Sequence, residues 1–320
     1  MRSKISKLLS IILPVLLGAV LIIYQYNSFS ASELAEMKSY FIKADYFYVV
    51  LSLVIALLGF LSRAYRWKYS LAHLGYHPKF HNNLLAVCIA YFVNLSIPRS
   101  GEISRALILK KYEDVPFDKA FGTIVAERVV DLAIFGLCVL LSMAFQFEFL
   151  KQFVLETIPL EKLAYISIAL FLLMAIFILL WIFSKWKVIL SLKAKVAGLV
   201  EGILSIYYMP NKIPFLVHSF FIWITYILMF YVTVFALPET SGIGFGTLIT
   251  AFVFGSLAIG FTNSGFGAYP LLIAQIFVLY GIPETIGTAF GWIVWISQTV
   301  LIVILGLLSF AFLPLLNRDK

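Results

Sequence analysis

NLSIPRSGEISRA, residues 94–106, interrupts one of the apolar segments that dominate this chain. Pro98 ends a helix because its ring clashes with the preceding turn and its nitrogen has no hydrogen to donate. Arg99, Glu102 and Arg105 follow directly, and a charged side chain at the centre of a membrane helix costs roughly 3 kcal/mol. The stretch therefore predicts a break within the membrane, buried in protein or lining a wet cavity.

The composition defines the class of protein. Of 320 residues, 62% are hydrophobic and 12% are charged, against about 25% charged residues in an average soluble domain. The mean hydropathy of +1.00 agrees, and we expect an all-α polytopic integral membrane protein. A crossing helix needs about 20 apolar residues, and the segments that meet this need are 8–26, 45–62, 117–145, 163–183, 214–237 and 285–313.

We expect a single membrane domain over residues 1–320. The longest polar stretch, 184–213, is shorter than the roughly 50 residues at which independent domains begin. Its apolar residues alternate with lysines, as in an amphipathic helix on the cytoplasmic surface that links two repeats. The expected parts are a first repeat at 1–145, the start of a second repeat at 146–183, the linker at 184–213 and the rest of the second repeat at 214–320.

Basic residues predict the orientation. They cluster at 2–7, 63–79, 110–119, 185–212 and 318–320, and the positive-inside rule assigns all five regions, Arg63 and Arg66 included, to the cytoplasm. Both termini are then cytoplasmic, the N-terminal run is an uncleaved anchor, and loops 27–44 and 146–162 face the other side of a bacterial cytoplasmic (inner) membrane. The net charge of +8 fits anionic lipid headgroups, with no nucleic acid as partner.

This orientation predicts a hairpin at the quoted stretch. Both flanking regions are cytoplasmic, so the chain between them must enter the membrane and return to the same side. Its first arm, 80–97, spans about 27 Å at 1.5 Å per residue, but its second arm, 101–112, spans only about 18 Å. The second arm is too short to cross, which favours a re-entrant helical hairpin.

The C-terminal half has the same order of elements. Residues 240–283 carry no formal charge and are interrupted at Asn263-Ser264-Gly265-Phe266-Gly267, before a long apolar helix. VPFDKAFGTIV at 115–125 also resembles IPETIGTAFGWIV at 282–294. Three crossings in each half invert the second copy relative to the first. The prediction is six full transmembrane helices plus two re-entrant hairpins in an inverted repeat, the plan of many transporters, with a site near the midplane.

A second group of charges lies in AERVVDL. A helix that begins at Phe117 reaches Glu127 and Arg128 after about 15 Å, half of the hydrocarbon core, and Asp131 shares their face. With Arg99, Glu102 and Arg105, three arginines oppose three acids. Unpaired, these six charges would cost about 18 kcal/mol, more than a typical fold's stability. They form either an ionic network that joins hairpin to helix or a polar pocket for an anionic group, which we favour.

The pocket hypothesis names specific groups. Pro98 ends the first arm, Ser100 is expected to cap the second, and the helix beginning near Gly101 directs free N–H groups at the break. Arginine forks suit phosphate, and the tip with Gly265 and Gly267 adds N–H groups without charge. The expected headgroup-binding and cavity residues are Arg99, Glu102, Arg105, Glu127, Arg128, Asp131, Asn94, Asn263, Ser264 and Gln298. No metal site and no cofactor are expected.

These motifs resemble a known family. Arg66-Trp67, then Pro98-Arg-Ser-Gly-Glu102 with Arg105, then Glu127-Arg128 with Asp131, and a glycine-bearing later break are similar to the transmembrane flippase-like domain of lysylphosphatidylglycerol synthetases, the multiple peptide resistance factor family. The resemblance covers nearly the whole chain. It implies movement of aminoacylated phosphatidylglycerol or related lipids between leaflets. The chain departs from the family's usual Pro-Gly-Gly at Asn263-Ser264-Gly265, and has Pro270 where a carboxylate is common.

Three function hypotheses follow. The leading one is a flippase-like or scramblase-like lipid translocase that moves an anionic or aminoacylated phospholipid through a midplane cavity, without being an enzyme. The second is an intramembrane lipid-modifying enzyme with Glu102 or Glu127 as acid or base. The third is a non-catalytic membrane subunit of a phosphatidylglycerol lysyltransferase-type system, with a separate lipid synthase as partner. No P-loop motif for ATP occurs in the sequence. Headgroup, direction and oligomeric state stay open.

Overall fold

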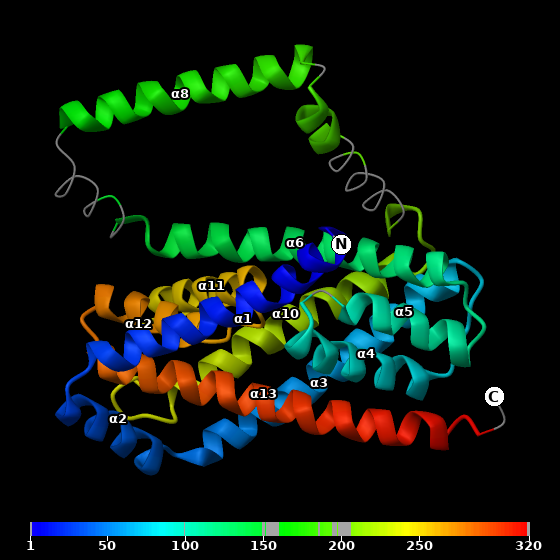
Figure 1. Cartoon of the computed structure of the whole chain (residues 1–320), viewed down its shortest axis with the longest axis horizontal. Helices are drawn as coiled ribbons and strands as arrows, with labels where there is room; N and C mark the ends of the chain where they lie inside the picture. Colours follow the sequence, from blue (N-terminus) through cyan, green and yellow to red (C-terminus); the bar gives the residue numbers. More distant parts are fainter. Residues whose placement is uncertain are drawn as a thin grey trace.

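The described residues of the computed structural model, 2–98, 100–148, 151, 160–184, 186–193, 197 and 206–318, form α-helices and no strand. The helices in chain order are α1 (Arg2–Ser28), α2 (Ala31–Lys43), α3 (Tyr46–His73), α4 (Phe80–Ser96), α5 (Gly101–Tyr112), α6 (Phe117–Phe145), α8 (Leu160–Phe183), α10 (Lys212–Val234), α11 (Phe245–Phe261), α12 (Ala268–Leu279) and α13 (Glu284–Leu315) (Figure 1). The all-α prediction is confirmed.

Membrane crossings are supported by length and composition. Among the described residues, α3, α10 and α13 are long and apolar enough to span a bilayer, and counting each bent helix pair as one span raises the number to five. Helix α8 is drawn apart from the other helices in Figure 1, and apolar side chains such as Phe171 and Leu173 are exposed on it. An apolar helix exposed in this way needs a lipid environment. The arrangement as six crossings with two re-entrant hairpins stays a prediction.

Helix α2 corrects one expectation, because residues 27–44 were predicted to be a loop. Ser30 caps α2 through a reciprocal pair of contacts with Glu33, in which each side chain accepts from the other residue's backbone N–H. The serine three residues before a glutamate was the available signal. Most of the opposite loop, 146–162, and residues 185, 194–196 and 198–205 of the amphipathic linker fall outside the described residues.

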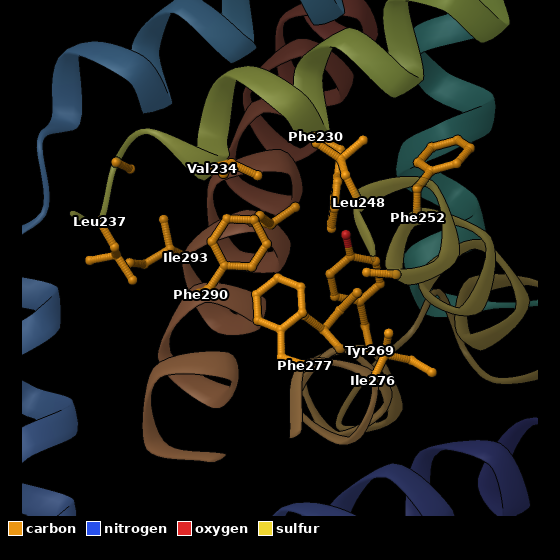
Figure 2. Packing of buried hydrophobic residues seen from close by; sticks show 14 of the residues in the cluster. Phe230, Val234, Leu237, Leu248, Phe252, Tyr269, Ile276, Phe277, Phe290 and Ile293 are labelled. Carbon is orange, nitrogen blue, oxygen red and sulfur yellow. The ribbon is translucent and has the colours of Figure 1, made fainter. Parts of the chain in front are cut away.

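The larger hydrophobic core joins α10, α11, α12 and α13 (Figure 2). Phe230 meets Phe290 edge-on with ring centroids 5.3 Å apart, and Phe277 lies 5.3 Å from the same ring. Small residues let α12 and α13 approach closely, since a methyl group at Gly291 would lie 2.6 Å from the Cα atom of Pro270. This packing holds the second hairpin, α11 and α12, rigidly against the last helix.

The two hairpins approach from opposite ends of the molecule. In Figure 1, α4 and α5 lie towards one end of the long axis, and α11 and α12 towards the other. Their breaks meet, because the Asn263 side-chain amide donates to the Leu95 carbonyl oxygen at 3.0 Å and the Ser264 hydroxyl donates to the Asn94 carbonyl oxygen at 3.2 Å. Two breaks that are 168 residues apart in the chain therefore form one contact.

Candidate functional site

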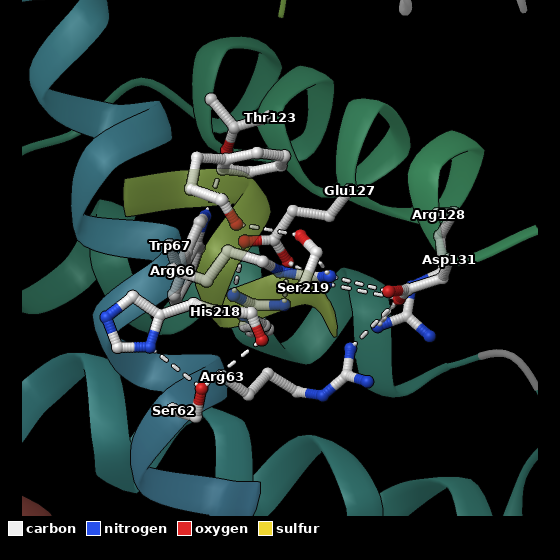
Figure 3. Close-up of polar contacts among 12 residues, drawn as sticks. Ser62, Arg63, Arg66, Trp67, Thr123, Glu127, Arg128, Asp131, His218 and Ser219 are labelled. Carbon is white, nitrogen blue, oxygen red and sulfur yellow. Dashed lines mark hydrogen bonds and ion pairs between the residues drawn. The ribbon is translucent and has the colours of Figure 1, made fainter. Parts of the chain in front are cut away.

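Helix α3 brings two arginines against the acids of α6 (Figure 3). Arg66 binds Asp131 through both terminal nitrogens, at 2.5 and 3.1 Å, and approaches Glu127 at 3.4 Å. Arg63 lies one helical turn earlier and contacts the same aspartate at 3.2 Å. Arg66 and Glu127 are fully buried, so these ions compensate one another in place of water.

Arg105 on α5 completes the network. It binds Glu127 at 2.9 Å, and its guanidinium carbon lies 3.7 Å from the ring centroid of Trp67, a cation–π contact. The Trp67 indole in turn donates to the Thr123 hydroxyl of α6 at 2.9 Å. Arg105 thereby links the first hairpin to α3 and α6.

Arg128 occupies a different position from the other arginines. It approaches Asp131 at 3.4 Å, and its side chain is 43% exposed, whereas those of Arg63 and Arg105 are 4% and 3% exposed. Asp131 already accepts from Arg63 and Arg66, so its charge is compensated without Arg128. The Arg128 guanidinium is therefore the part of the network best placed to serve a ligand.

The sequence did not predict these contacts of Arg63 and Arg66. Both were counted among the basic residues of 63–79 that set the orientation, whereas α3 continues to His73 and buries them in protein. The sequence contained a signal, because Arg63, Arg66 and Ser70 recur at helical spacing and the next glycine after them, Gly75, comes only after the helix. The expected balance of three arginines and three acids omitted these two residues.

A pocket of about 50 Å³ adjoins the network. At about 10–15 Å³ for each water, it has room for roughly four water-sized groups. Its lining comes from α3, α4, α5 and α6 and consists of Arg63, Val87, Ala90, Tyr91, Asn94, Glu102, Arg105 and Arg128. Three arginines face one glutamate here. With Arg66, Glu127 and Asp131 added, the described residues of the network and the pocket include four arginines and three acids. One positive charge among them is left uncompensated.

The tip of the first hairpin is built differently from the prediction. Ser100 does not cap α5 with its side chain; its hydroxyl donates backwards to the Ile97 carbonyl oxygen at 2.5 Å. Instead, the Asn94 side-chain oxygen accepts from the Gly101 backbone N–H at 2.7 Å. Because Asn94 also lines the pocket, this bond fixes one pocket wall to the start of α5.

The second tip contributes to the pocket indirectly. Ser264, Gly265 and Gly267 have left-handed backbone conformations, with φ of 53°, 81° and 70°, and the Trp295 indole donates to the Ser264 carbonyl oxygen at 2.8 Å. Neither Asn263 nor Ser264 is among the described lining residues; both contact the chain at Asn94 and Leu95.

The remaining predicted site residues lie elsewhere. Gln298 is half-buried on α13 and outside the pocket lining. Pro98 is half-buried between α4 and α5, while Arg99 falls outside the described residues. Tyr226 on α10 was missed, and its hydroxyl accepts from Arg63 at 2.9 Å and bonds the Tyr91 hydroxyl at 2.8 Å. Within the described residues no group of three metal-ligating side chains occurs.

The helices and this pocket define a multi-pass membrane protein whose buried arginine cluster borders a small polar cavity. Residues 11–306 match the family model described as the lysylphosphatidylglycerol synthase TM region, and the chain belongs to this family, as its motifs suggested. A UPF0104 membrane protein of Methanocaldococcus jannaschii is 35% identical over 128 residues, covering 38% of each chain. The match thus spans well under half of that relative's length. No solved structure matches the chain.

Proposed function

We propose that the protein is a lipid translocase, flippase-like or scramblase-like, that moves an anionic or aminoacylated phospholipid or a related lipid between leaflets. The observation that carries the proposal is the pocket lined by Arg63, Arg105 and Arg128 against a single acid, Glu102. An unmatched positive charge at membrane depth is costly. An anionic headgroup would lower this cost, since guanidinium forks match phosphate oxygens.

The position of Arg128 supports a lateral route into the pocket. Its side chain both lines the pocket and is 43% exposed, so a headgroup could enter beside it while the acyl chains stay in lipid. The meeting of the two hairpin breaks next to Asn94 supports passage between leaflets, because opposed, broken helices at a shared centre are the usual frame of an alternating site. The proposal includes no chemical step and no cofactor.

Purified protein in liposomes tests the proposal. Fluorescent phosphatidylglycerol in the outer leaflet is bleached by dithionite, so lipid exchange between leaflets appears as a larger bleached fraction. We expect the protein to accelerate exchange, and Arg128→Gln to slow it by about 10- to 100-fold, the equivalent of one charged hydrogen bond of about 1.5–3 kcal/mol. No acceleration with any anionic or aminoacylated lipid would refute the proposal.

Arg318→Gln is the matched control. Arg318 is exposed beyond the end of α13, so this variant loses the same charge without touching the pocket and should exchange lipid at the wild-type rate. Far-UV circular dichroism and gel filtration of both variants separate loss of function from loss of fold. A chemically altered lipid product after incubation would instead favour an enzyme.

A further inference from the structure

Three polar atoms on the pocket residues are buried and have no hydrogen-bond partner among the described residues. Two are donors, the Nε atoms of Arg63 and Arg105, and one is an acceptor, the Glu102 Oε2 atom. Buried polar groups are nearly always satisfied by protein, water or a ligand. A ligand that presented acceptors to the arginines and a donor to Glu102 would satisfy these groups.

The charge and the volume narrow the ligand further. The four arginines and three acids described in the network and the pocket leave one positive charge uncompensated, and a monoanion would balance it. The pocket's roughly 50 Å³, room for about four water-sized groups, matches the four oxygens of a single phosphate group. The pocket thus suits a small anion that carries its own hydrogen-bond donor.

We propose that the pocket recognises a terminal phosphate monoester on a lipid, bound as the monoanion. Its two unprotonated oxygens accept from the Arg63 and Arg105 guanidinium groups, Arg128 adds charge at the entrance, and its P–O–H group donates to Glu102. A phosphodiester has no such proton. This inference rests on the proposed function and narrows its substrate to lipids with a bare phosphate, such as phosphatidate or a polyprenyl phosphate.

Binding competition tests the inference with the purified full-length chain in mixed micelles. Fluorescent phosphatidate is the probe, and the competitors are phosphatidate, a polyprenyl phosphate, phosphatidylglycerol, lysylphosphatidylglycerol and free inorganic phosphate. We expect both monoester lipids to bind at least tenfold more tightly than phosphatidylglycerol. The relative affinities of the two monoester lipids identify the source, and free phosphate that competes as well as either lipid would show a soluble ligand and overturn the lipid assignment.

The pH dependence provides a second readout. The second pKa of a phosphate monoester is about 6, so the monoanion is the major form at pH 5.5 and the minor form at pH 7.5. Tighter binding of phosphatidate at pH 5.5, with phosphatidylglycerol unchanged, is expected. The groups that face the ligand are Arg63 from α3, Tyr91 from α4, Glu102 and Arg105 from α5, and Arg128 from α6.

Glu102→Gln removes the required acceptor charge while keeping the side-chain shape. The amide can donate to a dianion, so the variant should bind phosphatidate with little pH dependence. Equal or tighter binding of phosphatidylglycerol or lysylphosphatidylglycerol by the wild-type chain would overturn the monoester assignment. If exchange of those lipids in liposomes is accelerated at the same time, the translocase proposal still stands, so the two failures are distinguishable.

Discussion

Replacing Asp131 by asparagine tests whether the ionic network stabilises the fold. The carboxylate accepts from Arg66 at 2.5 and 3.1 Å and from Arg63 at 3.2 Å, and Arg128 lies 3.4 Å away. Asparagine keeps the volume but removes the charge and turns an amide N–H₂ towards guanidinium groups. The described ions would then carry two uncompensated positive charges in place of one.

Removing one partner of a buried ion pair costs about 3–5 kcal/mol, a large share of a typical total stability of about 5–15 kcal/mol. We expect Asp131→Asn to lower the free energy of unfolding by that amount. Equilibrium unfolding in mixed micelles, followed by the fluorescence of the 6 tryptophans and by circular dichroism, measures it.

Glu148→Gln is the matched acid-to-amide control. Its carboxylate is 81% exposed and pairs with Lys151 at 3.3 Å, an arrangement worth about 0–1 kcal/mol. If Asp131→Asn also lowers the free energy of unfolding by less than about 1 kcal/mol, water must stabilise the three arginine charges as well as the Asp131 carboxylate does. The network would then be a wet site, and its role in stability would be refuted.

Two backbone predictions concern the hairpin tips. Gly101→Ala should lower the free energy of unfolding by about 2 kcal/mol or more, because the added methyl group would overlap the Ala90 carbonyl oxygen. The control is Gly122→Ala on α6, where the methyl group meets open space, so the free energy of unfolding should stay the same or rise by up to about 1 kcal/mol. Equal losses in the two variants would contradict the close approach of Gly101 to Ala90. Ser264→Ala should lower the free energy of unfolding by about 1 kcal/mol more than Ser264→Gly does. Both variants lose the hydrogen bond to Asn94, but only glycine relieves the steric strain of the left-handed backbone at φ 53°. Unfolding titrations measure both pairs, and a less stable glycine variant would exclude backbone strain at Ser264.

The arms of the hairpins could be predicted well from the sequence. The first hairpin was expected at 80–97 and 101–112, and the helices run over Phe80–Ser96 and Gly101–Tyr112. Pro98 and the change from apolar to charged residues are local features, and they determine where a helix ends. The contact between the two breaks depends on packing between distant segments, and the order of elements only suggested it.

The composition of the site was harder to predict because charge was interpreted from its position in the chain alone. Arg63 and Arg66 follow an apolar segment, as interfacial arginines do, and only their packing against α6 distinguishes them from such residues. Asn94 was expected in the cavity, but the sequence could not show that its side chain, in place of Ser100, bonds the start of α5. In both cases, partners far apart in sequence determine the role.

The structural and ligand-binding hypotheses for the ions apply to two sets of residues that overlap. Arg66 is fully buried and contacts Glu127 and Asp131 of α6, so its loss should unfold the protein whatever the ligand. Glu102 and Arg128 are outside this compensated set, because one has a buried oxygen without a partner and the other is 43% exposed. Arg63 and Arg105 belong to both groups, since each pairs with an acid and lines the pocket. A headgroup that binds them therefore acts on the same ions that hold the first hairpin against α3 and α6, which would couple occupancy of the pocket to movement of the hairpin.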